Sequence, residues 1–243
     1  MTYCVGMLLD KGLVMAADTR TNAGVDNVGR FKKLYTWEYP GDRVFVLLTA
    51  GNLAVTQAVV SVISEQLEHP DEQGQSLKSI ATMFQAAHLV GDAIREVKRT
   101  DGEHMSSSGE SFAASFIFGG QIGSERPRLF NIYAAGNFIE ATPDTPFFQI
   151  GEHKYGKPIL DRVARTEMEL GEAAKMVLLS FDSTVRSNLS VGLPIDLLTY
   201  ETGSLRVEHT KRIGPDDPYF KMLSTEWSKA LRSAFANIEA LDI

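Results

Sequence analysis

The chain opens with MTYCVGMLLDKGLVMAAD, residues 1–18, and this stretch decides the fold. Two apolar runs, 3–9 and 13–18, flank the turn Asp10-Lys11-Gly12, which predicts a β-hairpin that ends on Asp18. Thr2 follows the initiator methionine directly. If Met1 is removed, Thr2 carries both a hydroxyl nucleophile and a free α-amine. That amine has an ordinary pKa near ~8, so it can accept the hydroxyl proton at neutral pH.

A pair of lysines follows in Arg30-Phe31-Lys32-Lys33-Leu34-Tyr35. Side chains alternate along a strand, so Lys32 and Lys33 lie on opposite faces and only one of them can face Thr2. A cation beside the Thr2 hydroxyl favours its deprotonated form, and an acid behind the cation holds it in place. The same run also fits a strand with solvated basic positions, and the residues alone leave both interpretations open.

Thr2, the span Gly12–Arg20 and Lys33-Leu34 together resemble the start of a proteasome β-type subunit, an N-terminal-nucleophile hydrolase of the threonine peptidase kind. The resemblance continues through NIYAAG, residues 131–136, and QIG, residues 149–151, and covers nearly the whole chain. Counted from Thr2, the acid falls in the family's place and the lysine arrives one residue early. A one-residue deletion in the turn at 22–27 would account for this.

Within that superfamily, GEHKYGKPILDR, residues 151–162, and a threonine directly after methionine without a propeptide resemble the bacterial ancestral-β-subunit branch, Anbu. The resemblance implies an α+β fold of four layers, an αββα sandwich, formed by residues 1–243 as a single domain. The order of apolar strand runs and amphipathic helices independently favours two sheets packed face to face between helix layers.

The resemblance also implies a mechanism. The Thr2 hydroxyl attacks a peptide carbonyl, the Thr2 amine moves the proton, Lys33 lowers the pKa of the hydroxyl, and Asp18 orients Lys33. Backbone N–H groups of residues 48–51 would hold the oxyanion, beginning with Leu48. The family usually has glycine at that position, so the Leu48 side chain is expected to narrow the cleft.

Two further segments depart from the family pattern. Glu152 stands where the family has serine after glycine. It either accepts a hydrogen bond from the terminal ammonium and raises its pKa, or faces a neighbouring subunit. DSTVRSN, residues 182–188, resembles the corresponding segment of the heat-shock-locus V peptidase (HslV). Ser187 is therefore predicted as the hydroxyl near the terminal amine, with Asp182 as a supporting acid, although an ordinary helix end fits equally well.

Local patterns predict the remaining elements. Further strands are expected at 31–37, 43–50, 111–119, 128–134, 137–141, 195–201 and 204–211, and amphipathic stretches at about 155–165 and 171–188. Asn52 should cap a helix that runs to Glu68, and His69–Gly74 should break it. Ser76 should cap a second helix that ends near Arg99, and the serine-rich run Thr100–Glu110 is typical of a mobile loop. A closing helix is expected from Asp217 to Leu241.

Composition excludes several classes of function. The formal charge of −7 argues against a nucleic-acid partner, and the single cysteine, Cys4, excludes an internal disulfide and a cysteine metal cluster. No run approaches the ~18 apolar residues of a membrane span. Asp10-Lys11 interrupts the apolar start, which rules out a signal peptide. We expect a cytoplasmic protein without metal or cofactor, in which Cys4 is a small core residue.

The resemblance implies a peptide or protein substrate and self-assembly into a homo-oligomer of many subunits, as a ring or an open spiral. A closed ring would call for an ATPase unfoldase as partner. Two alternatives stay open. The same nucleophile could serve an amidohydrolase of small amides. If Met1 is retained, the Thr2 nitrogen is an amide, and the chain would be a non-catalytic assembly subunit.

Overall fold

The computed structural model describes residues 2–22, 28–68 and 76–242. Its strands form two five-stranded sheets and a short two-stranded ribbon, and neighbouring strands are antiparallel. The first sheet has the order β10-β1-β2-β11-β12, with the bounds Phe147–Gly151, Tyr3–Leu9, Gly12–Asp18, Ile195–Glu201 and His209–Ile213. The second has the order β5-β6-β7-β8-β9, with the bounds Leu34–Tyr39, Arg43–Gly51, Ala114–Ile122, Arg128–Tyr133 and Phe138–Glu140. The ribbon pairs β3, Arg20–Asn22, with β4, Val28–Arg30.

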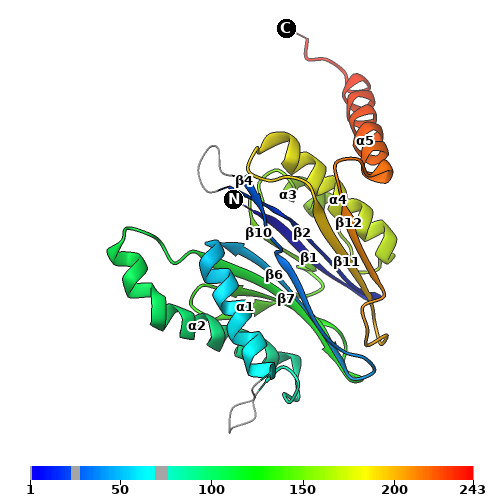
Figure 1. The fold of residues 1–243 in the computed structure, drawn as a ribbon. Helices are drawn as coiled ribbons and strands as arrows, with labels where there is room; N and C mark the ends of the chain where they lie inside the picture. The colour runs from blue at the N-terminus through cyan, green and yellow to red at the C-terminus, as the bar shows by residue number, and fades with distance from the viewer. Residues whose placement is uncertain (1, 23–27, 69–75, 243) are drawn as a thin grey trace.

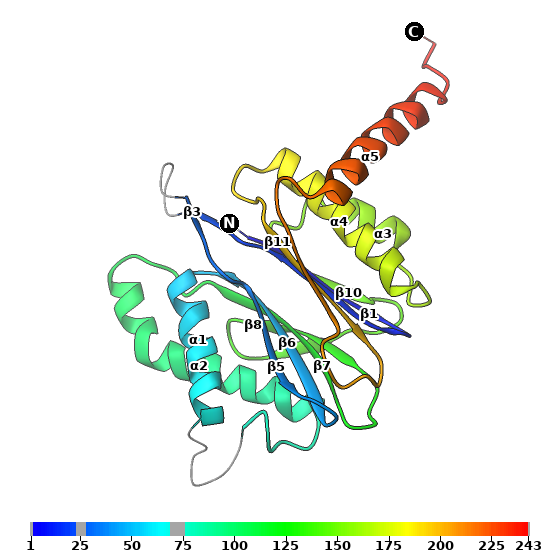
Figure 2. The same ribbon diagram turned by 45° about the vertical axis from the view of Figure 1, so that its right-hand side comes forward.

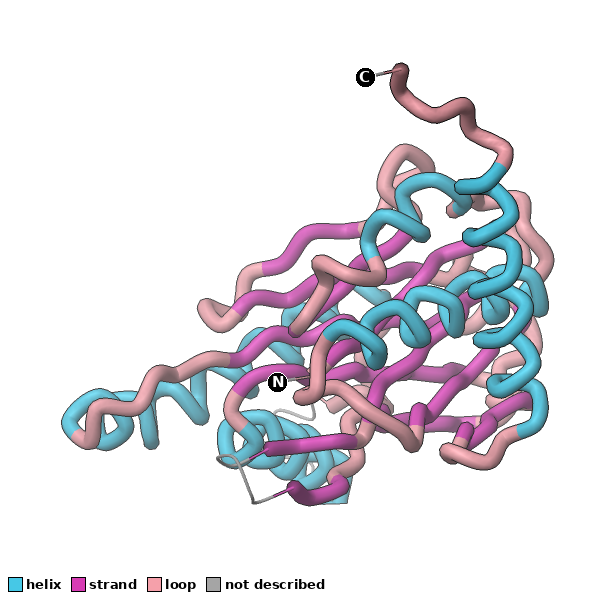
Figure 3. Tube along the Cα trace, turned by 90° about the horizontal axis from the view of Figure 1, so that it is seen from above, coloured by secondary structure: helices cyan, strands magenta, loops and turns pink. Residues whose placement is uncertain are grey.

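Helices cover the outer face of each sheet (Figure 1). On the second sheet lie α1, Leu53–Glu68, and α2, Met83–Ser107. On the first lie α3, Lys157–Val163, and α4, Leu170–Ser187. The layers therefore follow the order helix, sheet, sheet, helix, which confirms the predicted α+β sandwich (Figures 2 and 3). The last helix, α5, Pro218–Ala236, packs on α4 at its start and then leaves the body of the molecule.

The central strands are buried on both faces, which explains why their sequences are apolar without a polar alternate. In β1, Tyr3, Val5 and Met7 pack against the α3–α4 layer, whereas Cys4 faces the space between the sheets. In β6, Phe45 and Leu47 face α1 and α2, and the intervening residues join the inter-sheet core. Strand β1 is therefore an interior strand, and the residue that precedes it enters the sandwich from its end.

The second helix differs from the sequence-based prediction. Its N-cap is Thr82, whose side chain accepts the Gln85 N–H at 3.2 Å, so the helix begins seven positions after Ser76. It continues to Ser107, through most of the segment expected to be a loop. The serines there return hydrogen bonds to helix carbonyls, as when Ser106 Oγ donates to Gly102 O at 2.9 Å. By contrast, Asn52 caps α1 as predicted, since its Oδ1 accepts the Ala54 N–H at 3.0 Å.

Three strands were not predicted: β10 and the two members of the ribbon. They are short, so periodicity gave little signal. The predicted break at His69–Gly74 and residues 23–27 of the turn with the proposed deletion lie outside the described residues. Within the described ranges, no helix has the length and apolar character needed to cross a membrane.

Candidate active site

Strand β10 clamps the backbone of Thr2. The Glu152 N–H donates to the Thr2 carbonyl oxygen at 2.7 Å, and Gly151 pairs with Tyr3 in the ladder. Gly151 has a φ of +82°, and a Cβ there would lie 1.9 Å from the Thr2 carbonyl oxygen. Only glycine tolerates this approach. The contact explains the glycine of the QIG motif, because it lets β10 press directly against the residue that carries the hydroxyl.

Asp18, at the end of β2, is the centre of a cluster that also contains Thr2 and Lys33. Its Oδ1 accepts the Lys33 ammonium at 2.8 Å and the Tyr3 N–H at 3.0 Å. Its Oδ2 accepts the Gly192 N–H at 3.3 Å. Burial raises the pKa of Asp18, and the Lys33 charge and the two backbone donors oppose that rise. One carboxylate thus ties the lysine to the residue directly after Thr2.

Lys33 directly precedes β5, and its backbone is held against β6. The Thr49 N–H donates to the Lys33 carbonyl at 3.0 Å, which fixes its backbone against β6. Its ammonium also donates to the Arg20 carbonyl at 2.5 Å and is almost completely buried. Lys32 is exposed instead, with its ammonium 5.2 Å from the centre of the Tyr35 ring. The two lysines therefore separate as expected, and Lys33 is the inward one.

The direction of the Thr2 side chain follows from alternation along β1. Cys4 faces the inter-sheet core, and Thr2, two residues earlier, shares that face. Cys4 is fully buried, its Sγ donates to the Thr49 carbonyl at 3.6 Å, and burial raises the pKa of its thiol. A protonated, enclosed thiol fits the predicted core role. Thr2 is 7% exposed and Lys33 3%, so both belong to one enclosed region between the sheet ends.

Glu152 lies beside Thr2, and its carboxylate has a partner within the chain. Its Oε2 accepts the Asn188 amide at 3.0 Å, while its backbone holds the Thr2 carbonyl. Asn188 Oδ1 accepts the Ser190 N–H at 2.8 Å, so one amide links the end of α4 to the segment after β10. Asn188 belongs to the DSTVRSN segment, but the sequence pattern pointed to its neighbour, Ser187.

Among the residues that the structure describes, neither Ser187 nor Asp182 forms a hydrogen bond with Thr2, Asp18 or Lys33. Ser187 is the last residue of α4 and is exposed, and its side chain forms no hydrogen bond within the described part of the chain. Asp182 is buried and pairs with Arg186, with 3.2 Å between its Oδ2 and the Arg186 Nε. Arg186 also donates to Ser224 of α5 at 2.7 Å. Asp182 therefore contributes to the contact between α4 and α5.

The loop at 188–192 contains contacts that sequence reasoning missed. Gly192 donates its N–H to Asp18, and the Arg20 guanidinium donates to the Leu189 carbonyl at 2.9 Å. These contacts join the ribbon β3–β4 to the loop after α4 around the Asp18–Lys33 pair. Each of these contacts uses a backbone atom of the loop, so the residue types of the loop do not reveal it.

The predicted oxyanion donor, Leu48, is poorly placed for that role. The N–H of Thr49 points to β5, since it donates to Lys33, and N–H directions alternate along a strand. The Leu48 N–H therefore points to β7, opposite Ile117, and the Leu48 side chain is fully buried in the inter-sheet core. It neither narrows a cleft nor offers a free donor. The same alternation directs the Gly51 N–H to the side of β5, beyond the point where β5 begins.

Within the described residues, no group of three or more histidine, cysteine, aspartate or glutamate side chains is placed to hold a metal ion. The chemistry available at this cluster is that of a hydroxyl, a buried lysine and a buried carboxylate. Such a set can stabilise an alkoxide electrostatically but holds no histidine base. The base would have to come from the Thr2 nitrogen.

Comparison with known proteins gives concordant results. The family model described as "Proteasome subunit" matches residues 2–198. The Anbu (Gly-1) mutant from Hyphomicrobium sp. strain MC1 is 61% identical, with a TM-score of 0.93 over 100% of both chains. Anbu from Yersinia bercovieri is 46% identical, with a TM-score of 0.92 over 99% of both chains. The helical assembly of the Anbu complex from Pseudomonas aeruginosa contains a chain 44% identical, with a TM-score of 0.93, covering 99% of this chain and 98% of that one. A search of curated proteins gives no match.

Proposed function

The chain belongs to the proteasome family and resembles Anbu structures over its full length, and from this premise we propose that it is a threonine peptidase that acts through Thr2 once Met1 has been removed. Its substrate would be a peptide or protein segment, and its place of action the cytoplasm. No cofactor takes part. Residues 1–243 would work as one domain.

In the proposed reaction the Thr2 Oγ attacks the scissile carbonyl carbon while its proton passes to the Thr2 α-amine. The C–N bond then breaks, the amine returns the proton to the leaving nitrogen, and an ester joins Thr2 to the acyl part. Water, deprotonated by the same amine, hydrolyses that ester and restores the hydroxyl. The Lys33 ammonium stabilises the alkoxide form of the hydroxyl, and Asp18 holds the ammonium in place.

The observation that carries this proposal is the double use of the Asp18 carboxylate. It accepts the Lys33 ammonium and the N–H of Tyr3 through the same oxygen. The cation is thus positioned relative to the nucleophile by a single group of fixed geometry. An ion pair buried this deeply, with both side chains less than 5% exposed, contributes little net stability as a rule. A catalytic reason for keeping it is therefore favoured.

As oxyanion donor we propose the Gly51 N–H in place of the Leu48 N–H, because alternation from Thr49 directs it to the β5 side of β6, beyond the start of β5. Glu152 is held by Asn188, and its position beside Thr2 fits a role in tuning the terminal amine. Ser187 and Asp182 are left out of the proposed machinery.

Removal of Met1 decides between the peptidase and a non-catalytic subunit. We expect the intact mass of the purified protein to be lower than that of the full sequence by one methionine, because only a free Thr2 amine can act as the base. Mass spectrometry of the same preparation that is assayed for peptide hydrolysis checks this. Activity in a preparation that keeps Met1 on every molecule would contradict the mechanism.

Self-assembly is the second part of the proposal, and α5 supports it. In addition to its contact with α4, α5 and the residues after it expose large apolar side chains, namely Tyr219, Met222, Leu231, Phe235, Ile238 and Leu241. A groove of about 260 Å³ lies between α4 and the first half of α5, lined by Leu179, Tyr219, Met222, Leu223, Trp227 and Ala230. Exposed apolar surface next to an apolar groove on one element is typical of an interface between copies.

We expect Leu231→Asp combined with Phe235→Asp to break the assembly into smaller species, because two charges would have to be buried in an apolar contact. Sedimentation velocity at fixed protein concentration measures the change. Ser233→Asp adds the same kind of charge on another exposed position of α5 and should leave the assembly intact. An unchanged sedimentation profile for the double variant would exclude α5 as an essential interface. Ring or spiral geometry and an ATPase partner remain predictions.

A further inference from the structure

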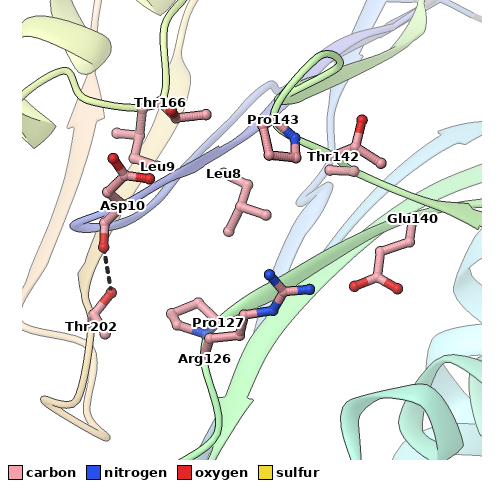
Figure 4. Close-up of a pocket in the computed structure, with 11 residues that line it drawn as sticks. Leu8, Leu9, Asp10, Arg126, Pro127, Glu140, Thr142, Pro143, Thr166 and Thr202 are labelled. Atoms are coloured by element: carbon pink, nitrogen blue, oxygen red, sulfur yellow. Dashed lines mark hydrogen bonds between the residues drawn. The ribbon is translucent and has the colours of Figure 1, made fainter.

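A cavity of about 420 Å³ lies at the opposite end of β1 from Thr2. Five segments meet around it (Figure 4): the end of β1, the turn before β8, the residues after β9, the loop between α3 and α4, and the turn between β11 and β12. The proposed peptidase chemistry uses none of these residues. The volume of the cavity falls within the range of small-molecule sites.

The walls of this cavity are fixed by backbone hydrogen bonds between the segments. The Leu8 N–H donates to the Pro146 carbonyl at 2.7 Å, and the Asp10 N–H donates to the Thr166 carbonyl at 2.9 Å. The Thr202 N–H donates to the carbonyl of the residue after Asp10 at 2.9 Å. A ligand would therefore enter a preformed site and would not have to order the loops that enclose it.

The lining combines an apolar floor with one unpaired cation. Leu9, Pro127 and Ala141 are buried, and with Leu8 they form an aliphatic surface. Arg126 extends its guanidinium into the space between Leu8 and Glu140 (Figure 4).

The nearby carboxylates do not neutralise Arg126. Glu140 already receives two bonds from Arg128, from Nε at 2.7 Å and from Nη2 at 2.5 Å. Asp10 lies across the cavity from Arg126, beside Thr202 (Figure 4). Among the residues that the structure describes, no carboxylate forms an ion pair with Arg126. Its fork of donors is thus free to bind an anion bidentately.

We propose that this cavity binds a carboxylate that carries a branched aliphatic group, with the carboxylate on Arg126 and the aliphatic group on the floor of Leu8, Leu9, Pro127 and Ala141. Thr142, Thr166 and Thr202 at the rim offer hydroxyls to a neighbouring polar group. Two sources share this chemistry: the carboxyl end of a peptide that ends in leucine, and a free branched fatty acid. The carboxylate and the branched aliphatic group are the recognised features in both.

Ligand-observed saturation-transfer NMR on the full assembled protein tests the proposal. The probes are N-acetyl-alanyl-leucine, its C-terminal amide and 4-methylpentanoate. We expect the peptide acid to bind with a dissociation constant of roughly a millimolar, as its size allows, and the amide to bind at least about tenfold more weakly. Binding of the peptide acid alone identifies peptide ends as the ligand. Binding of both acids identifies the carboxylate with its aliphatic group.

Variants at position 126 provide the decisive arm. Arg126→Gln should weaken the peptide acid about tenfold or more, and Arg126→Lys should have an intermediate effect because it keeps the charge but loses the fork. Arg126 is exposed, so neither change should disturb folding. Arg99→Gln, at an exposed position on α2, makes the same charge change elsewhere and should bind as the parent does. Equal binding of acid and amide, binding unchanged in Arg126→Gln, or no binding would each overturn the proposal.

Discussion

Replacing Thr2 by alanine is expected to lower the turnover of a peptide substrate by at least about a thousandfold, because removal of an enzyme nucleophile leaves only binding and oxyanion contributions. The fold and the assembly should be unchanged. Thr2 is anchored by its carbonyl and by the N–H of the next residue, and alanine keeps both contacts. Fluorogenic peptide hydrolysis, with sedimentation of the same sample, measures the two effects separately.

Thr2→Ser is the matched control, since it keeps the hydroxyl and the α-amine and should retain a large part of the activity. Intact mass must be measured for each variant so that Met1 removal is the same in all of them. Normal turnover by Thr2→Ala would show that some other group attacks the substrate and would end the proposal for this site.

The second large effect is expected at Lys33. Lys33→Met should lower turnover by an amount similar to that of Thr2→Ala, because the Thr2 hydroxyl loses the cation that favours its alkoxide form. It should also destabilise the fold by about 3 kcal/mol or more, since the Asp18 carboxylate is left buried without its charge partner. Burial already raises the pKa of Asp18, so the unpaired carboxyl would take up a proton more readily. Thermal unfolding and peptide hydrolysis together measure both consequences.

A double variant separates the catalytic role of Lys33 from its structural role. Asp18→Asn combined with Lys33→Met removes both buried charges and should recover much of the lost stability while remaining inactive. Lys32→Met is the control for charge, because Lys32 is exposed and its ammonium lies over the Tyr35 ring, so activity should change little. If the double variant regained activity along with stability, Lys33 would be a structural residue.

The interior strands were predictable from sequence because they are buried on both faces. The hairpin 3–9 and 13–18, the strand at 43–50 and the helix capped by Asn52 all agree with the structure within a few residues. Their signals are local: uninterrupted apolar runs, a turn with glycine, and a capping amide. The same holds for the two lysines, since opposite exposure of neighbouring side chains follows from backbone geometry alone.

The supporting contacts of the site could not be predicted in the same way. Gly192 and Glu152 act through backbone N–H groups, and Asn188 reaches Glu152 across 36 positions of sequence. Such contacts depend on how β10 and the loop after α4 pack, and β10 was not predicted. Leu48 failed for a related reason. Counting positions along a strand does not say which neighbouring strand each N–H faces. One known hydrogen bond, here from Thr49 to Lys33, is needed to assign the alternating N–H groups to β5 or to β7.

The hydrogen bonds between β10 and the start of β1 have a consequence for the removal of Met1. The atoms that hold Thr2 are its carbonyl oxygen and the amide of the following residue, and both lie downstream of the bond to Met1. Trimming that bond would therefore change the reactivity of the threonine without moving it. The unprocessed chain would already have its final fold, and cleavage of the bond between Met1 and Thr2 alone would make the site active.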